Sequence, residues 1–375
     1  MAGIYFHYPF CSQACNYCNF HFSTQTKYRQ EMEQAMNSEL YLRKSELKKP
    51  IESIYFGGGS PSLLPASFFY KTIKSVKNYF KLNDNIEVTL EANPNDLSLK
   101  NLKDLKKSGV NRISLGVQSF EDDELKMMNR IHNASQGLKA IEWTSKVFDN
   151  FSVDLIYGLP QSNISSWADN LDTLISFKPP HISSYALTVE PKTLLYYQVE
   201  KGEVKLLDEE TVKFQYDLLI SRLEKESYIN YEFSNFGKFG FHSVNNSNYW
   251  SGKPYLGIGP SAHSFDGHRL RSWNISNNLK YLKSIEKGYL PQTKEVLKDH
   301  EVFNEYVMIG LRTNGVKIRG VNEYFGSNYV VFLEKQMKKH LLSRSLFWDG
   351  DVLKVSRHAR FLTDGIASDL FMLRG

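Results

Sequence analysis

The sequence predicts an α/β fold: a partial (β/α)6 barrel, followed by a small winged-helix-like α+β domain at the C-terminal end. Six short runs rich in Ile, Val, Tyr and Phe alternate with segments in which apolar residues recur every three to four positions. This alternation is typical of βαβ units, which build a parallel sheet with right-handed crossovers. After about residue 300, two helical segments precede a predicted hairpin, as in a winged-helix unit.

The barrel strands are predicted as short segments that end in glycine, proline or polar residues. The six strands are residues 3–9, 53–58, 86–93, 111–118, 152–158 and 181–189. Helical spacing is clearest over residues 28–47, 102–110 and 205–226. Because the carboxyl ends of barrel strands carry the chemistry in such folds, we expect the functional residues at those ends.

The chain after the sixth strand has a different character. Residues 228–265 are rich in Gly, Ser and Asn, which predicts loops, and in Tyr, Phe and Trp, which predicts that these loops are packed. Helices are then predicted over residues 300–313, 329–342 and 358–371, with a hairpin over 346–356 that turns at Asp349-Gly350. We therefore expect three parts: 1–225 with the barrel, 226–299 closing the site, and 300–375 as the small domain.

Charge and hydropathy argue against several classes of protein. The net charge of +5 (46 Lys+Arg against 41 Asp+Glu) is too small to indicate nucleic-acid binding.

No apolar run approaches the ~20 residues that span a bilayer. The start "MAGIYFHYPF" lacks the basic region of a signal peptide. We expect a cytoplasmic protein with reduced thiols, and peripheral membrane contact stays open. The aromatic content of 14% predicts an aromatic-rich core.

All three cysteines lie in "CSQACNYCNF", residues 11–20. Their odd number argues against a disulfide framework. A zinc site with His7 or His21 as fourth ligand is one alternative, although zinc loops usually use two separated pairs of ligands. An iron–sulfur cluster fits better, because thiolates ligate [4Fe–4S] clusters, and three of them leave one iron open to a small ligand.

The Cys-x3-Cys-x2-Cys spacing after the first strand, with "GGGSPS" after the second, resembles the radical S-adenosylmethionine (SAM) superfamily. The resemblance implies that Cys11, Cys15 and Cys18 ligate a [4Fe–4S] cluster whose open iron binds the methionyl part of SAM. One electron from the cluster then splits the sulfonium and yields a 5′-deoxyadenosyl radical. The glycine motif contacts the methionyl amino group, where the absence of Cβ atoms allows close approach.

Blocks over nearly the whole chain are similar to the oxygen-independent coproporphyrinogen III oxidase family. These blocks are "YFHYPFCSQACNYCNF", "YFGGGSPS", "LEANP", "RISLGVQSF", "VDLIYGLP" and "LGIGPSAHSF". The resemblance implies a SAM site lined by Tyr5, Tyr17, Gly58, Gly59, Ser60 and Glu91. Gln118, Arg130 and Asp154 match positions that contact a second SAM in the oxidase. Ordinary roles stay open for several of them: aromatic packing for the tyrosines, helix capping for the carboxylates and surface exposure for the arginine.

Two departures from the oxidase match its sister group, the HemW-type heme chaperones. The oxidase has a fourth cysteine where this chain has Phe20, and a long extension before its first strand. HemW-type proteins bind heme and hand it to an acceptor protein, so the resemblance implies heme as cargo without coproporphyrinogen oxidase activity, and cleavage of SAM stays open. The alternatives are an oxidase or another radical SAM enzyme acting on a tetrapyrrole, and a winged-helix protein that senses iron or oxygen.

The HemW-type motif His-Asn-x-x-Tyr-Trp has a partial counterpart in "NNSNYW", residues 245–250. Asn246, Tyr249 and Trp250 match the motif, and Asn245 stands where the motif has histidine. Imidazole is a common axial ligand of heme iron and an amide is not, so heme ligation at position 245 is in doubt. The two aromatic side chains would stack on a porphyrin or pack the core.

Two other histidines are candidates for the heme ligand. His242 lies three residues before position 245 and would replace the missing imidazole if both shared one helical turn. His263 lies in "PSAHSF", within the last of the similar blocks.

Overall fold

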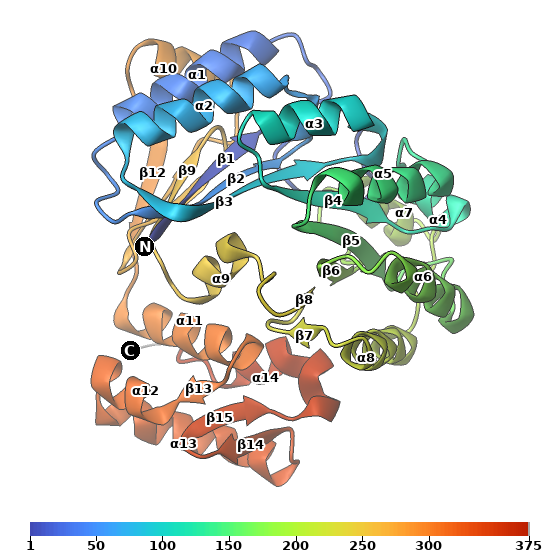
Figure 1. Cartoon of the computed structure of the whole chain (residues 1–375). Helices are drawn as coiled ribbons and strands as arrows, with labels where there is room; N and C mark the ends of the chain where they lie inside the picture. Colours follow the sequence, from blue (N-terminus) through green and yellow to red (C-terminus); the bar gives the residue numbers. More distant parts are fainter. Residues whose placement is uncertain (374–375) are drawn as a thin grey trace. The chain divides into compact units, whose positions relative to one another are not determined.

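The six predicted barrel strands are present in the computed structural model, which describes residues 1–373 (Figure 1). They are β1 (Ala2–Tyr8), β2 (Ile51–Gly58), β3 (Leu82–Ala92), β4 (Arg112–Gln118), β5 (Phe151–Tyr157) and β6 (His181–Ala186). Neighbours in this series pair in parallel, which confirms the partial barrel. Helices and single helical turns connect them: α1 (Arg29–Leu42), η1 (Pro61–Leu63), α2 (Ala66–Tyr79), η2 (Pro94–Asp96), α3 (Leu99–Lys107), α4 (Asp122–Met127), α5 (Ala134–Val147) and α6 (Ile164–Ser176).

The sheet continues beyond both edges of this core. Its strand order is β12-β11-β10-β9-β1-β2-β3-β4-β5-β6-β8-β7. The added elements are α7 (Leu194–Glu200), α8 (Glu209–Lys225), β7 (Ile229–Asn230), β8 (Asn235–Gly237), α9 (Val244–Trp250), β9 (Tyr255–Ile258), β10 (His263–Phe265), β11 (Leu270–Asn274), α10 (Asn278–Glu286) and β12 (Gln292–Val296). Residues 228–265, predicted as packed loops, thus contain short strands and a helix, and β9 pairs in parallel with β1.

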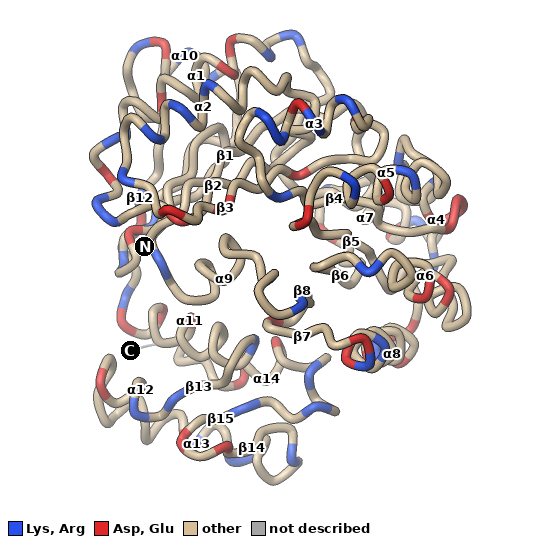
Figure 2. The backbone as a smooth tube through the Cα atoms, in the orientation of Figure 1, with Lys and Arg blue, Asp and Glu red and all other residues tan. Residues whose placement is uncertain are grey.

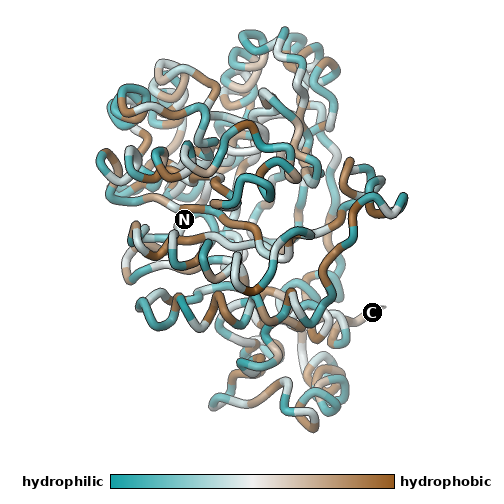
Figure 3. The backbone as a smooth tube through the Cα atoms, turned by 90° about the vertical axis from the view of Figure 1, so that its right-hand side faces the viewer, coloured by the Kyte–Doolittle hydropathy of each residue, from teal (hydrophilic) through white to brown (hydrophobic). Residues whose placement is uncertain are grey.

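Helices cover the outer face of the barrel sheet, and α9 lies on the opposite face (Figure 1). The outer face is packed with aromatic rings, as the composition predicted. Phe6 stacks on Phe56 with ring centroids 4.9 Å apart, and Phe69 meets Phe56 edge-on at 5.0 Å. Along the helices, hydrophobic and hydrophilic residues alternate (Figure 3), and Lys and Arg are interspersed with Asp and Glu (Figure 2). This pattern is typical of helices that bury one face and expose the other.

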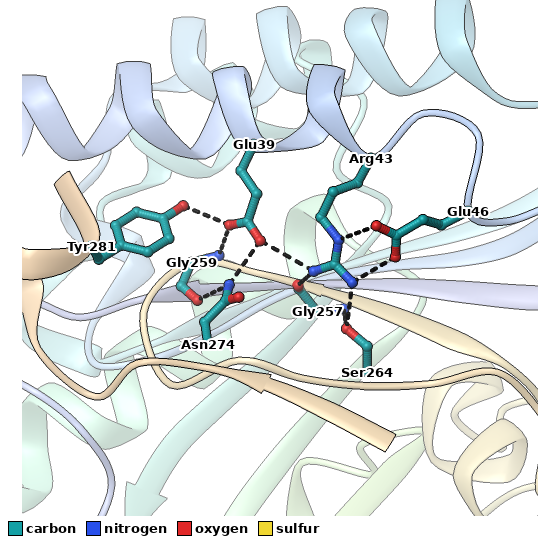
Figure 4. A network of polar contacts seen from close by, with 8 residues as sticks. All are labelled: Glu39, Arg43, Glu46, Gly257, Gly259, Ser264, Asn274 and Tyr281. Carbon is teal, nitrogen blue, oxygen red and sulfur yellow. Dashed lines mark hydrogen bonds and ion pairs between the residues drawn. The ribbon is translucent and has the colours of Figure 1, made fainter. Parts of the chain in front are cut away.

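A buried polar network ties α1 to the turn after β9 (Figure 4). The Glu39 carboxylate accepts hydrogen bonds from the Gly259 N–H (2.8 Å), the Tyr281 hydroxyl (2.6 Å) and the Asn274 amide (2.7 Å). It also pairs with the Arg43 guanidinium at 3.1 Å, and the two side chains are 0% and 1% exposed.

The same guanidinium continues the network toward β9 and the surface. Arg43 donates to the Gly257 carbonyl at 2.7 Å and to the Glu46 carboxylate at 2.8 Å. The buried charge pair therefore connects α1 to the backbone of β9 and of the turn after it.

The chain divides into two compact units. One contains Met1–Ile229 and Phe236–Lys294, and the other contains Asn230–Asn235 with the chain from Glu295 onward. The three-part division expected from the sequence stays a prediction.

The second unit has the predicted α+β character. Its elements are α11 (Asp299–Arg312), β13 (Val316–Lys317), α12 (Ile318–Phe325), α13 (Ser327–Leu342), β14 (Leu346–Asp349), β15 (Val352–Val355), η3 (Arg357–Leu362) and α14 (Thr363–Asp369). The strands form an antiparallel sheet in the order β13-β15-β14 around a core that includes Phe303, Leu333 and Leu353. The expected turn position is wrong by one residue: the hairpin turns at Gly350-Asp351, where Gly350 has φ +63°.

Within residues 1–373, we find no helix that is both long and apolar enough to cross a membrane.

A candidate cluster and cofactor site

The cysteine loop follows the carboxyl end of β1, as expected for a barrel site. Cys11, Cys15 and Cys18 are free thiols and partly buried. The start of the loop is fixed by backbone hydrogen bonds, because the Cys11 N–H donates to the Ser23 carbonyl (3.1 Å) and the Ser23 N–H donates to the Pro9 carbonyl (2.8 Å).

Each of the three sulfurs has a hydrogen-bond donor beside it. The Ser60 hydroxyl lies at Cys11, a guanidinium N–H of Arg130 lies 3.4 Å from the Cys15 Sγ, and the backbone N–H of Phe20 lies at Cys18. Burial raises the pKa of Cys11 to about 11 and also raises the pKa of Cys18. Donors to sulfur favour the thiolate, and hydrogen bonds to sulfur are one of the means by which proteins tune iron–sulfur clusters. The residues present therefore fit a cluster held by three thiolates.

The geometry differs from that of a site for a single metal ion. In the described part of the chain, no three His, Cys, Asp or Glu side chains converge as such an ion would require, and this includes the zinc set with His7 or His21. A cubane cluster binds each thiolate at a separate iron, so its ligands are spread apart.

The cysteine loop rests on the turn that follows α4. The Asn16 amide donates to the Met127 carbonyl (2.7 Å), and the Gln13 amide donates to the Asn129 carbonyl (2.8 Å). Asn129 adopts φ +57° and donates from its own amide to the Ala14 carbonyl at 2.7 Å. The middle of the cysteine loop is thereby fastened to residues 127–130.

The glycine motif packs directly against the start of the cysteine loop. The Gly59 N–H donates to the Tyr8 carbonyl (2.7 Å), and the Ser60 N–H donates to the Phe10 carbonyl (2.8 Å). A Cβ at Gly59 would lie 2.7 Å from the Phe10 carbonyl oxygen. Gly58 has φ +105°, and the ring of His7 lies where its Cβ would be. The glycines thus allow backbone to approach backbone beside Cys11.

We expect Gly59→Ala to reduce cluster loading, because the added methyl group pushes the glycine motif away from the cysteine loop. Overpacking of this kind costs about 1–3 kcal/mol. Iron and sulfide content after anaerobic reconstitution measures the effect. Gly365→Ala is the control, because nothing lies within 4 Å of its Cβ position. Equal loading of both variants would show that the close approach is unnecessary.

Glu91 is a carboxyl group at the end of β3. It accepts hydrogen bonds from the Tyr55 hydroxyl (2.9 Å) and the Gly58 N–H (3.1 Å). Burial raises its pKa to about 7, and the nearby charge of Asp154 adds to this effect. Tyr5 lies in the same electrostatic environment, and burial and Glu91 raise its pKa as well. Glu91 is therefore poised between its two protonation states near neutral pH.

The other predicted SAM residues lie around this group in different settings. The Asp154 carboxylate accepts hydrogen bonds from the hydroxyls of Ser114 (3.1 Å) and Ser152 (3.0 Å), and burial raises its pKa. Gln118 has φ +70°, and its side chain amide folds back over Gly116.

The Tyr17 ring packs against apolar side chains, which is one of the roles that the sequence left open for it. It packs against a small apolar cluster and lies in hydrogen-bond contact with Cys15. The members of that cluster are Leu125, Met128, Ile156 and Leu159. The SAM contacts of all these residues stay predictions.

Helix α9, which carries the partial motif, begins on a carboxylate of the barrel. Glu87 accepts hydrogen bonds from the backbone N–H groups of Val244 (3.0 Å) and Asn245 (3.2 Å). The Asn245 side chain is buried and lies 3.4 Å from the Ser53 hydroxyl. The position at which the motif has histidine therefore points into the barrel.

The other three motif residues are partly buried on α9. Tyr249 meets Tyr255 edge-on at 4.6 Å and interacts electrostatically with Glu91, so this ring lies within the barrel site. Asn246 and Trp250 are partly exposed. A role of these three residues in heme binding stays a prediction.

The condition under which His242 would replace the missing imidazole, one helical turn shared with position 245, is not met. Helix α9 begins at Val244, and the Ser243 hydroxyl caps it by accepting a hydrogen bond from the Asn246 N–H (3.3 Å). His242 precedes this cap, and its ring packs against Gly237. His263 lies apart on β10, is exposed, and stacks on Trp273 with ring centroids 5.8 Å apart. The structure therefore does not bring the two candidate histidines together.

Three site residues were not predicted: Tyr55, Glu87 and Asn93. Tyr55 binds Glu91, Glu87 caps α9, and Asn93 accepts a hydrogen bond from Arg130 at 2.8 Å. A signal for two of them was present, because residues two or four apart along an extended chain share a face: Glu87 lies four residues before Glu91, and Asn93 lies two residues after it in "LEANP". No comparable signal marks Tyr55.

Comparisons with known proteins agree with this geometry. The model of the radical SAM superfamily matches residues 5–174. The heme chaperone HemW of Bacillus subtilis (strain 168) is 34% identical over 332 residues, which is 87% of this chain and 87% of that protein. The heme chaperone HemW of Haemophilus influenzae is 36% identical, with 81% of each chain covered. The mitochondrial radical S-adenosyl methionine domain-containing protein 1 of Danio rerio is 32% identical, with 84% and 73% covered.

A solved structure shares the fold. The coproporphyrinogen III oxidase HemN from Escherichia coli, a radical SAM enzyme, matches 100% of this chain and 90% of its own with a TM-score of 0.85. Its sequence identity is 20%, so the likeness supports the fold alone.

Proposed function

This chain belongs to the HemW family of radical SAM proteins, and from that membership we propose that it binds heme and passes it to an acceptor protein. In this proposal Cys11, Cys15 and Cys18 hold a [4Fe–4S] cluster, and SAM binds at the open iron. When bound, these two cofactors supply one-electron chemistry. The glycine motif, Tyr5 and Glu91 are the residues that would bind and orient SAM.

The observation in the structure that supports the cluster of this proposal is the set of three donors to three sulfurs. Phe20 stands where the oxidase pattern has a fourth cysteine, is 67% exposed and offers its backbone N–H to Cys18. A loop built in this way supports three thiolates and leaves one iron for an exchangeable ligand.

We propose His263 as the axial ligand of the heme iron. Its imidazole is exposed on β10 and rests on Trp273, so it is accessible to an iron. His242 is less accessible because its ring packs closely against the backbone of Gly237. Asn245 is buried beside Ser53 and offers an amide, which is a poor heme ligand.

The test of the function is anaerobic. The cluster is reconstituted, heme is titrated with and without SAM, and the visible spectrum is followed. Stoichiometric heme uptake, together with unchanged coproporphyrinogen III in a parallel incubation, is the expected result. Turnover of coproporphyrinogen without heme uptake would replace the chaperone by an enzyme acting on a tetrapyrrole.

We expect His263→Ala to weaken heme binding at least about tenfold, because even outer partners of metal ligands are worth about 10–100-fold in affinity. His242→Ala is the matched control and leaves heme affinity within about twofold of wild type. A loss confined to His242→Ala would move the ligand to the segment before α9. Cluster absorbance, measured in both variants, shows that each retains the barrel site.

A further inference from the structure

We propose that Arg130 sets the reduction potential of the cluster by donating a hydrogen bond and a positive charge to the Cys15 thiolate. This inference rests on the three-thiolate cluster of the proposed function. Arg130 was expected from the sequence only as a contact of a second SAM or as a surface residue. The structure gives its guanidinium a different set of partners.

The guanidinium is held in a fixed position by its other contacts. One terminal nitrogen (Nη2) donates to the Asn93 side-chain oxygen and to the Gly116 carbonyl, both at 2.8 Å. The other (Nη1) lies 3.4 Å from the Cys15 Sγ. Asn93 follows β3 and Gly116 lies on β4, so two strand ends aim the guanidinium at the sulfur. To bind a SAM carboxylate in a forked geometry, Arg130 would have to give up these partners.

Arg130 is the charged member among the three donors to sulfur. The Ser60 hydroxyl at Cys11 and the Phe20 N–H at Cys18 are neutral. Reduction adds one electron to the cluster and makes its net charge more negative. A cation that donates to a ligating thiolate therefore stabilises the reduced form more than the oxidised form, and the potential rises.

The turn that carries Arg130 also holds the cysteine loop. The Asn129 side chain donates to the Ala14 carbonyl, and its backbone carbonyl accepts from Gln13. Asn129 is neutral and supports the loop, while Arg130 brings the charge. Loop support and charge therefore come from different residues of this turn, and a control for charge is taken from an exposed cation elsewhere.

The experiment is a redox titration of the full chain with reconstituted cluster and no SAM. Dithionite supplies the single electrons through mediators, and the EPR signal of the reduced cluster is followed. We expect Arg130→Met to move the reduction equilibrium at least about tenfold toward the oxidised form, which is a midpoint about 59 mV lower for one electron. We expect Arg130→Lys, which keeps the charge, to shift the midpoint less than Arg130→Gln, which removes it. Lys126→Met, which removes an exposed cation from α4, is the matched control and keeps the wild-type midpoint.

The outcomes separate this inference from the function it rests on. An Arg130→Met cluster that loads normally and keeps the wild-type midpoint would overturn the role of Arg130, as would an equal shift in Lys126→Met. If the Arg130→Met variant does not load a cluster, the midpoints of Arg130→Lys and Arg130→Gln test the role of the charge. Equal midpoints in these two variants would overturn that role. Iron and sulfide content report loading independently. A wild-type chain that binds no cluster would instead refute the proposed function.

Discussion

Replacing Arg43 by methionine lowers the free energy of unfolding by about 3–5 kcal/mol, the usual effect of removing one partner from a buried ion pair. The Glu39 carboxylate, which is 0% exposed, would lose the guanidinium 3.1 Å away that offsets the cost of burying its charge. Its remaining donors, the Gly259 N–H, the Tyr281 hydroxyl and the Asn274 amide, are neutral. Urea unfolding followed by circular dichroism measures the loss.

The control for this prediction is an exposed ion pair with the same spacing. Lys146 and Glu142 are also four residues apart on a helix, and their side chains are 56% and 53% exposed. Lys146→Met is expected to change the unfolding free energy by less than about 1 kcal/mol, because solvent screens surface pairs. Equal effects of Arg43→Met and Lys146→Met would show that the network of Figure 4 contributes no more than a surface contact.

A double substitution tests whether the two charges act as a pair. Glu39→Leu with Arg43→Met removes both charges and replaces them with apolar side chains. The double variant is expected to lose less stability than the sum of the two single variants, since neither charge is then left alone in the interior. Additive losses would argue that the two side chains act separately through their neutral partners.

The barrel core was predictable because its signals are local. Each of the six strands carries a run of β-branched and aromatic residues, and each helix has its own apolar spacing. The parallel pairing of β9 with β1 has no such signal, because "YLGI" is short and lies among glycines. Its contacts are with distant residues, such as β1 and Glu39, whose carboxylate binds the Gly259 N–H. In the sequence, Glu39 and Arg43 look like an ordinary solvated pair on a helix.

The candidate site was predictable where a motif supplied it. The three cysteines and the glycine motif have a spacing that few other sites share. The direction of a side chain is harder to predict, and "NNSNYW" illustrates this. The sequence allowed one helical turn to contain His242 and Asn245, whereas the Ser243 cap excludes His242 from the helix. The contact of Arg130 with Cys15 joins residues 115 positions apart, and no periodicity in the sequence reports it.

Replacing Glu91 by glutamine changes how stability depends on pH. In the folded chain the pKa of Glu91 is about 7, against its usual 4.5, because burial and the charge of Asp154 oppose ionisation. The folded state therefore holds this proton more tightly than the unfolded state. As pH rises from 4.5 to 7, the unfolding free energy falls, by about 3 kcal/mol at about 1.36 kcal/mol per pKa unit.

The effect of Glu91 is isolated by a difference curve, in which the unfolding free energy of wild type minus that of Glu91→Gln is plotted against pH. His7 and His132, each with a pKa lowered to about 4 by burial, give the opposite slope, because stability falls as pH drops from 6.5. Subtracting the unfolding free energy of Glu91→Gln from that of wild type removes their contribution. The difference is expected to fall by about 3 kcal/mol between pH 5 and 8. Glu142→Gln, at an exposed carboxylate, is expected to give a flat difference over this range.

The same difference curve, measured with and without SAM, tests whether Glu91 binds the proposed cofactor. Hydroxyl groups that donate to a carboxylate favour its charged form and lower its pKa. If the ribose of SAM donates to Glu91, adding SAM reduces the slope of the difference curve, because the folded state then releases the proton at lower pH. A slope that SAM leaves unchanged would place the ribose elsewhere in the site. A flat curve without SAM would mean that water or a flexible loop solvates Glu91 despite its contacts with Tyr55 and Gly58.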